Sequence, residues 1–422
     1  MLAEKINTTK VLTDYLTHTA GKVSFIKNSL ITDALAKIEK SGLPNSKHED
    51  YKYCNLEAFL LKEFTALNSK TESQPISIPK NKNHLNIVVV NGNYVRELSD
   101  QNTIKGLHIT KFSELPESKI NNIGTLADPN KDLFIALNTA YSGDGFYLEV
   151  DKNAIIKNVV KIWYIQTNQN QSAVNPRSFI ELQEGSSIQI IEEHLNQGKE
   201  KVFTNYLSEK KLHSKAKLET VHIQDEKEKG FSVNTNEVHV HKQANYLNTT
   251  ITISGNVVRN NHNVIMNGEF CETHLYGLFL TKNAQLVDNH TLMDHQVANC
   301  ESFELYKGVV NDKSVGVFNG KIFVRKDAQK TNAYQSSKNI LLSDDATLNT
   351  KPQLEIYADD VKCSHGTSTG KIDTEALFYL NARGINNDSA NKLLLNAFAL
   401  EVLEKISIEN VKEELEERLG FN

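Results

Sequence analysis

The chain has 422 residues, of which 39% are hydrophobic and 23% are charged, and its 47 basic and 52 acidic side chains give a formal net charge of −5. This length suggests two or three domains, or one long repetitive core with smaller ends. The acidic balance argues against broad nucleic-acid binding, which normally needs a basic face.

Neither a membrane span nor a secretory signal is expected from the sequence. The longest apolar runs, such as Ile87–Val90 and Leu393–Leu395, are far too short to cross a bilayer. The opening residues, MLAEKINTTKVLTDYL, contain no apolar stretch followed by a small-residue cleavage site. The four cysteines are widely spaced and form no CxxC pair: Cys54, Cys271, Cys300 and Cys363. We therefore expect free thiols in a reducing, cytoplasmic compartment.

The first part of the chain predicts helices. Residues 23–40 place their apolar side chains on one broad face, and Gly42 and Pro44 end the pattern. A second, short helix is expected to end near Phe64. Residues 66–83 are polar and contain two prolines, which is typical of a linker. We assign residues 1–83 to an N-terminal helical domain and linker.

A mixed connecting segment is expected over residues 84–143. Leu85–Val95 predicts a pair of strands around the Asn91-Gly92 turn. Residues 113–141 predict short helices and loops.

The pattern changes at about residue 144 and stays uniform to residue 371. The segments become short, β-branched and bounded by small turn residues, as in VVKIWYIQT and VGVFNGKIFV. Several alternate apolar with polar residues, which indicates strands. A loose, irregular repeat places a small residue just before many of them. Many short strands with stacked small turns favour a β-solenoid, and a β-sandwich is the rival interpretation.

Residues 372–422 predict a C-terminal helical domain in which acidic side chains outnumber basic ones. An apolar stripe runs along its last two helices: Leu394, Phe398, Val402, Ile406, Val411 and Leu415. We expect this stripe, beside the acidic face, to form a partner-binding surface. The alternatives are amphipathic helices with a solvated face, or helices that cap the open end of the solenoid.

Few motifs in the chain carry chemistry. The sequence contains neither GxxxxGK[ST] nor GxGxxG, so no nucleotide is expected to bind in those ways, and neither GxSxG nor HExxH is present. Cys271 with His274 and His290 with His295 are expected to have structural roles.

Cys363 and His365 form the best candidate pair. Two residues apart on an extended chain, a thiolate and an imidazole project to the same side and suit a soft or borderline metal such as iron. Gly366 removes bulk beside them, which lets backbone or a partner approach closely. The alternatives are a buried thiol beside a hydrogen-bonded histidine, and an enzymatic site completed by Asp360.

These residues lie in a segment with a clear resemblance. ADDVKCSHGTSTGKIDTEALFYLNARGI closely resembles the C-terminal signature of the SufB/SufD family of iron–sulfur cluster assembly scaffold proteins. LYKGVVNDKSVGVFNGKIFVRKDAQKTNAYQSSKNILL upstream and EDYKYCNL near residue 50 fit the same family. The upstream block is more similar to the SufD branch than to SufB.

The resemblance implies a mainly β fold, with a right-handed parallel β-helix as the core and α-helical domains at both ends. It implies a scaffold rather than an enzyme, which pairs with a SufB-like subunit and binds a SufC-like ATPase through its C-terminal helices. By the same resemblance, His365 is the favoured ligand and Cys363 a secondary one, for a transient iron–sulfur cluster or iron shared with the partner. Alone, the chain is expected to form a homodimer. The competing hypothesis is a stand-alone metal- or Cys/His-dependent enzyme on a β-helix.

Overall fold

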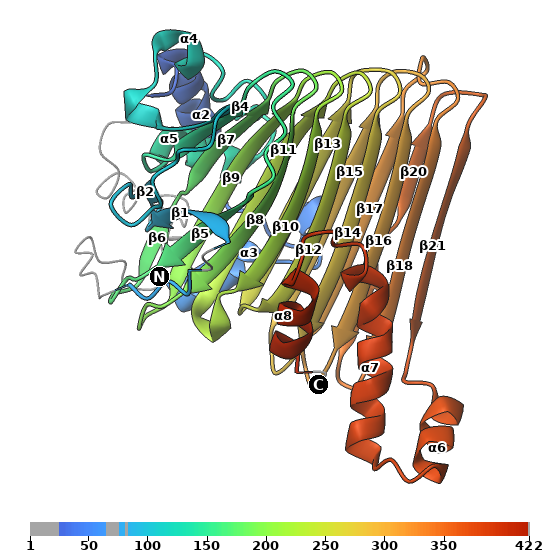
Figure 1. The fold of residues 1–422 in the computed structure, drawn as a ribbon. Helices are drawn as coiled ribbons and strands as arrows, with labels where there is room; N and C mark the ends of the chain where they lie inside the picture. Colours follow the sequence, from blue (N-terminus) through green and yellow to red (C-terminus); the bar gives the residue numbers. More distant parts are fainter. Residues whose placement is uncertain (1–24, 65–75, 81–82, 421–422) are drawn as a thin grey trace, which may run out of the picture.

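The structure is a computed structural model that describes residues 25–64, 76–80 and 83–420. Two long sheets, built mainly from parallel strands, face each other along one axis (Figure 1). This arrangement confirms the predicted parallel β-helix and rules out the sandwich. Residues 1–24 and much of the expected linker, 65–75 and 81–82, lie outside the described residues.

The ten-stranded sheet contains, in spatial order, β2 (Asn93–Tyr94), β1 (His84–Val90), β5 (Val159–Gln166), β8 (Ser187–Asn196), β10 (Lys217–Asp225), β12 (Asn245–Ser254), β14 (Glu272–Thr281), β16 (Glu301–Val310), β18 (Asn332–Leu341) and β21 (Lys362–Gly370). The eleven-stranded sheet contains β19 (Thr347–Thr350), β17 (Val315–Val324), β15 (Leu286–His295), β13 (Val257–Met266), β11 (Gly230–Val240), β9 (Val202–Leu212), β7 (Arg177–Leu182), β4 (Phe146–Val150) and β3 (Leu107–Lys111), with β20 (Gln353–Ile356) beside β17 and β6 (Ser172–Val174) beside β9.

The helices are α2 (Asn28–Lys40), α3 (Leu56–Glu63), α4 (Glu117–Ile120), α5 (Leu133–Tyr141), α6 (Thr374–Ala382), α7 (Asn387–Leu403) and α8 (Val411–Arg418), with short 3-10 turns η1 (Glu49–Tyr51), η2 (Phe112–Glu114) and η3 (Lys227–Lys229). None of these described helices combines the length and the apolar character that a membrane crossing requires.

The strands alternate between the two sheets, so each coil hydrogen-bonds to the coil before it. The small-residue repeat marks the corners of these coils. Ala216 and Ala244 are buried, and the residue before each, Lys215 or Gln243, adopts a left-handed φ of 62° or 58°. Such a turn leaves room for only a small side chain at the start of the next strand, which explains why the repeat was visible in the sequence.

The segment expected to connect the helices to the core forms part of the first coil. The predicted strand pair around Asn91-Gly92 is confirmed, with Val89 opposite Tyr94 in antiparallel register. β1 also pairs with β5 in parallel, and β3 pairs with β4 antiparallel. The β-helix therefore begins with β1, upstream of residue 144.

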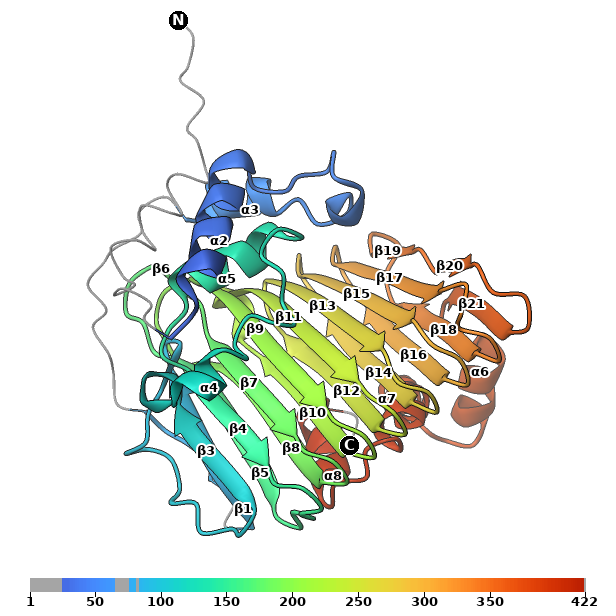
Figure 2. The same ribbon diagram turned by 90° about the horizontal axis from the view of Figure 1, so that it is seen from above.

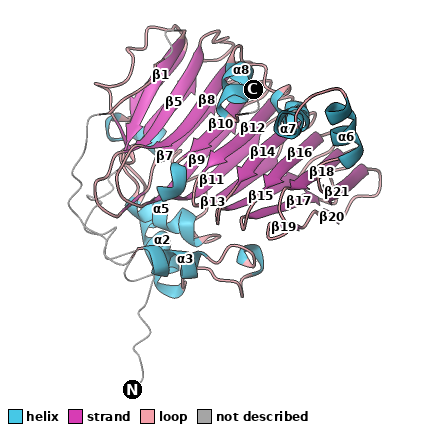
Figure 3. Cartoon of the chain, turned by 90° about the horizontal axis from the view of Figure 1, so that it is seen from below, coloured by secondary structure: helices cyan, strands magenta, loops and turns pink. Residues whose placement is uncertain are grey.

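The helices cover the outer faces of the two sheets. α2, α3 and α5 pack on the eleven-stranded sheet through an apolar cluster that includes Phe134, Phe203 and Phe231 (Figure 2). α7 and α8 pack on the ten-stranded sheet, on the opposite side of the molecule (Figure 3). The alternative that the C-terminal helices cap the open end of the solenoid is wrong for α7 and α8, because their apolar residues meet the broad side of the sheet.

A fully buried ion pair within the β-helix anchors α5 and the loop before it. The Arg177 guanidinium lies 2.7 Å from a carboxylate oxygen of Glu209, and neither side chain is exposed. Arg177 also donates to the Thr139 hydroxyl at 3.1 Å. Glu209 accepts from the backbone N–H groups of Gly124 and Leu126, in the loop before α5.

We expect Arg177→Met to lower the free energy of unfolding by about 3–5 kcal/mol, because it leaves the Glu209 carboxylate buried without its cation. The matched control is Lys152→Met, since the Lys152–Glu184 pair has side chains that are 65% and 46% exposed. That control should change stability by less than about 1 kcal/mol. Urea denaturation followed by circular dichroism measures both values, and equal losses would contradict the assignment of Arg177 as a structural anchor.

Candidate functional site

The candidate metal pair lies on the last strand of the ten-stranded sheet. β21 pairs in parallel with β18, and no other described strand pairs with it. All of its residues except Cys363 are exposed. The pair therefore lies at an open edge of the sheet, where backbone groups are available to another strand.

The opposite edge of the same sheet is closed. The Val88 N–H donates to the Ser99 hydroxyl at 2.9 Å, and the Asn86 N–H donates to the Asp100 carboxylate at 2.9 Å. The backbone N–H of Asp100 returns a hydrogen bond to the Asn86 carbonyl at 2.8 Å. The chain thus protects its first edge with its own residues and leaves its last edge available.

Strand register determines where Cys363 and His365 point. Cys363 lies opposite Ala333, and His365 lies opposite Gln335, on β18. Both β18 side chains are buried inside the β-helix, at 0% and 3% exposure. Cys363 and His365 therefore face the interior, but His365 is exposed because no further described coil covers it. This confirms that the two side chains share a face.

The third inward residue on β21 supports this direction. The Thr367 hydroxyl lies 3.1 Å from the Thr350 hydroxyl on β19, which belongs to the opposite sheet. The inner faces of β21 and β19 therefore meet across the end of the β-helix.

Cys363 is half-buried and packs against the edge of the apolar core. Burial raises the pKa of its thiol, although a backbone hydrogen bond involving Ala333 acts in the opposite direction. The thiol is therefore mostly protonated near neutral pH. It must lose its proton before it can ligate a metal.

Cys363 and His365 do not form a complete metal site with other described residues. Cys363 and His365 belong to no group of three or more His, Cys, Asp or Glu side chains whose ligand atoms lie within 4.8 Å of one another, among the residues that were described. Asp360 is fixed by its backbone, which bonds to Gln329 and Lys330. An iron centre normally has more than two protein ligands, so iron bound by this pair would need ligands from elsewhere.

The surroundings of the pair are open. A Cβ atom placed on Gly366 or Gly370 would meet no atom within 4 Å. On the outer face, the rings of His274, Phe303 and Tyr334 stack in succession, with centroids 5.1 and 5.4 Å apart. This stack ends at Tyr334, which is 38% exposed beside β21.

The predicted partner-binding stripe is largely covered by the chain itself. Four of its residues are buried between the helices and the ten-stranded sheet: Val402, Ile406, Val411 and Leu415. The other two, Leu394 and Phe398, are half-buried. The Lys307 ammonium lies 4.2 Å from the centre of the Phe398 ring and forms an ion pair with Glu401.

The exposed apolar surface of the C-terminal region lies instead on α6 and the start of α7. Phe378 is 74% exposed, Tyr379 56% and Leu393 47%. α6 has no buried residue, and in Figure 1 it projects beyond the body of the β-helix. The sequence analysis assigned partner binding to the longest apolar stripe, on the last two helices, and so did not identify this surface. The indicative signal was the adjacent Phe378 and Tyr379 on a short helix, which no single helical face can bury.

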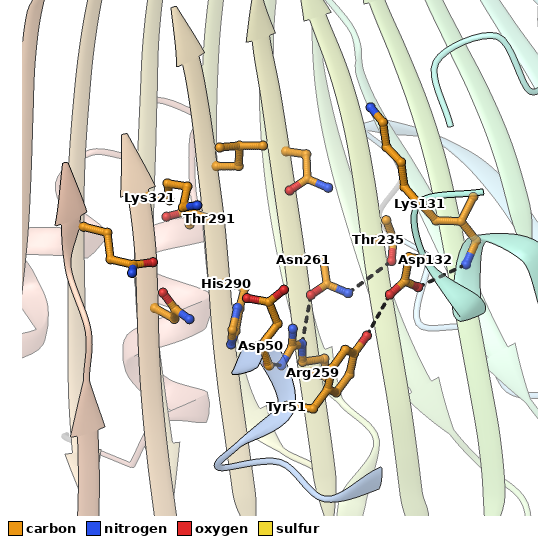
Figure 4. Close-up of a pocket in the computed structure, with 15 residues that line it drawn as sticks. Asp50, Tyr51, Lys131, Asp132, Thr235, Arg259, Asn261, His290, Thr291 and Lys321 are labelled. Carbon is orange, nitrogen blue, oxygen red and sulfur yellow. Dashed lines mark hydrogen bonds between the residues drawn. The ribbon is translucent and has the colours of Figure 1, made fainter. Parts of the chain in front are cut away.

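A polar groove of about 270 Å³ lies on the other side of the molecule, between η1 and the eleven-stranded sheet (Figure 4). Its principal groups are already paired. The Tyr51 hydroxyl donates to Asp132 at 2.9 Å, and Arg259 bonds to Asp288 and to the Asp50 carbonyl, each at 2.6 Å. These contacts hold η1 against β13, so we assign the groove a structural role.

The other histidine pairs also have structural partners. His290 lies 3.0 Å from Asp288, whereas His295 is buried in the interior, 2.9 Å from the Ser302 hydroxyl. Cys271 is buried at a corner, and His274 stacks on Phe303. Neither pair meets at a common site.

The fold and the site together define a class of protein: a β-helix whose uncovered last coil presents an incomplete ligand set. Comparison with known proteins agrees with this class. The family model described as "SUF system FeS cluster assembly, SufBD core domain" matches residues 164–398, and the model for the SufBD protein N-terminal region matches residues 14–162.

Three curated relatives are similar over most of the chain. Iron–sulfur cluster assembly protein SufD of Escherichia coli is 28% identical, over 92% of this chain and 90% of the relative. A SufBD family protein of Synechocystis is 26% identical, over 88% and 85%. SufD of Bacillus subtilis is 27% identical, over 76% and 74%. The chain belongs to the SufBD family of iron–sulfur cluster assembly proteins.

The thiol environment predicts a characteristic reactivity. In the isolated chain, iodoacetamide should label Cys363 before the three buried cysteines: Cys54, Cys271 and Cys300. Because the thiolate is the reactive form and the pKa of Cys363 is raised, its rate should keep increasing at pH values where a free cysteine has reached its plateau. Mass spectrometry of digested, labelled protein measures the rates. If the labelling rate of Cys363 reached its plateau at a lower pH than that of a free cysteine, the described environment of the thiol would be contradicted.

Proposed function

We propose that this chain is a non-catalytic scaffold subunit for iron–sulfur cluster assembly. In this proposal, β21 pairs with the equivalent edge of a SufB-like partner, and His365, aided by Cys363, ligates a transient cluster or iron shared between them. The observation that carries the proposal is the inward-facing pair on an uncovered terminal strand. The cluster is the cargo of the assembly.

We infer edge-to-edge pairing because β21 is an exposed terminal strand with one free edge among the described residues. A strand from a second molecule would satisfy its backbone groups and continue the coil, as in β-strand addition. The same pairing would cover His365 and place the partner's side chains next to it. Without a SufB-like partner, a second copy of this chain would use the same edge, which gives a homodimer.

The chemistry of the pair suits a shared ligand set. An imidazole is a good ligand for iron, and a thiolate is the usual ligand of iron–sulfur clusters. We rank His365 first because it is exposed, whereas Cys363 is half-buried and its thiol has a raised pKa. The stand-alone enzyme is less well supported, since Asp360 contributes to the turn through its backbone.

A SufC-like ATPase is the proposed second partner, and α6 with the start of α7 is its proposed docking surface. Phe378, Tyr379 and Leu393 supply exposed apolar area there. Leu394 and Phe398 would contribute at the border, where they are half-buried. Nucleotide would bind to that subunit rather than to this chain. A reducing, cytoplasmic setting suits an assembly with four free thiols in this chain.

For the shared ligand set, we expect His365→Ala to leave folding and complex formation intact and to reduce cluster assembly by the complex by about tenfold or more. Cys363→Ser should reduce it less. Anaerobic reconstitution with the SufB-like partner and the ATPase, followed by Mössbauer spectroscopy, measures the clusters formed. His274→Ala is the matched control, because His274 lies on the outer face of β14, where it stacks on Phe303.

Full assembly by the His365→Ala complex, with complex formation verified by size-exclusion chromatography, would refute the ligand assignment. If Cys363→Ser is the more damaging of the two changes, the ranking of the ligands is wrong.

For the docking surface, we expect the double variant Phe378→Ala and Tyr379→Ala to weaken binding of the ATPase by about 30-fold or more, because exposed aromatic anchors dominate such interfaces. Its thermal stability should stay close to that of the unmodified chain. Leu415→Ala should behave in the opposite way, losing about 2–5 kcal/mol of stability through a core cavity while binding persists. Isothermal titration calorimetry and thermal denaturation separate the two effects. Unchanged ATPase binding by the aromatic variant would exclude α6 as the docking surface.

A further inference from the structure

A second cluster of ligating side chains lies deep inside the β-helix. Glu192 and His194 are two residues apart on β8, and His222 on β10 is the register partner of Glu192. Their ligand atoms all lie within 4.8 Å of one another, and Nε2 of His222 is 3.2 Å from Oε1 of Glu192. All three side chains are buried, with 2–3% exposure.

His194 has ligating atoms that the fold leaves unused. Neither of its buried ring nitrogens has a hydrogen-bond partner in the described chain. The Glu226 carboxylate, 3.9 Å from Nδ1, is beyond hydrogen-bonding distance. A buried polar group without a partner destabilises the folded state, so an additional ligand at His194 would offset that cost. The ring is held between Tyr164 and Tyr206, with centroids 4.9 and 4.2 Å away.

The types of side chain in this group suit a cation. Both ring nitrogens of His194 are buried without a hydrogen-bond partner in the described chain, and the Glu192 carboxylate lies 3.2 Å from the ring of His222. Two imidazoles with a carboxylate are a ligand set for divalent zinc or iron.

The available space and the nearby charges limit what can bind. The cavity beside these residues has a volume of about 10 Å³, which is close to the minimum for one water molecule or one ion. The Lys210 ammonium lies 2.9 Å from Glu192, and it also donates to Asn236 and Ser208. Lys210 therefore keeps two acceptors if Glu192 turns toward a metal.

We propose that Glu192, His194 and His222 form an internal binding site for one divalent first-row transition-metal ion. The ion crosslinks two consecutive coils and satisfies His194. Five strand spacings separate β10 from β21, or about 24 Å at 4.8 Å per strand. The internal site is therefore distinct from the Cys363–His365 edge and does not depend on the proposed scaffold function. Its depth means that the metal enters while the chain folds.

The test uses the full chain carrying Cys363→Ser and His365→Ala, which removes the terminal pair. The protein is produced in cobalt-supplemented minimal medium, desalted against a weak chelator and analysed by elemental mass spectrometry and visible absorption. We expect about one Co²⁺ per chain, with d–d bands of a nitrogen- and oxygen-ligated ion and no thiolate charge-transfer band.

Glu192→Gln and His222→Gln, added separately, should each reduce retained cobalt by about tenfold or more. The matched control is His262→Gln. His262 is another buried interior histidine, but its Nε2 is 3.0 Å from the Tyr246 hydroxyl and it lies outside the ligand group. This control should retain the cobalt.

Circular dichroism shows which variants fold. The cobalt content of the parent protein tests the proposal even if one of the variants does not fold. If the parent protein, which carries only Cys363→Ser and His365→Ala, retains no cobalt, the proposal is overturned. Equal cobalt content in the parent, Glu192→Gln and His222→Gln proteins overturns it as well.

Discussion

A parallel β-helix must pair every strand with the next coil, and this requirement breaks down at its two ends. From β5 to β18 the backbone groups of each strand pair in parallel with the neighbouring coils, with one register shift at Gln224/Asp225. The first edge is closed by Ser99 and Asp100, which bond to the backbone of β1. The last edge, β21, has no equivalent cover among the described residues. An open edge is normally avoided because it invites association, and the pairing proposed above rests on this exposed strand.

The arrangement of helices is consistent with that conclusion. Helices cover both broad outer faces, where they bury the apolar residues of the sheets, and they leave the terminal coil free (Figure 3). The apolar stripe on α7 and α8 therefore stabilises the body of the protein. The aromatic residues of α6 remain exposed. Neighbouring helices of the same C-terminal region therefore differ: α7 and α8 bury apolar residues against the sheet, whereas α6 exposes Phe378 and Tyr379.

The sequence predicted the solenoid and the shared face of Cys363 and His365, because turn spacing and strand alternation are local properties. It did not reveal that the last edge is open, since closure of the first edge depends on Ser99 and Asp100 meeting β1 across a turn. The burial of Val402 and Leu415 was equally hidden, because a helical stripe does not indicate whether it meets its own sheet or a partner. The sequence also could not predict the internal cluster of Glu192, His194 and His222. Glu192 and His222 are 30 positions apart and meet only through strand register.

The central claim is that β21 is the surface through which this chain pairs. Hydrogen–deuterium exchange of the isolated, dilute chain and of its complex with a SufB-like partner tests this claim most directly. The account predicts rapid exchange over Lys362–Gly370 in the isolated chain and strong protection in the complex, with little change in the segment that covers β1. Protection of the β1 end, with β21 still exchanging rapidly in a verified complex, would contradict it.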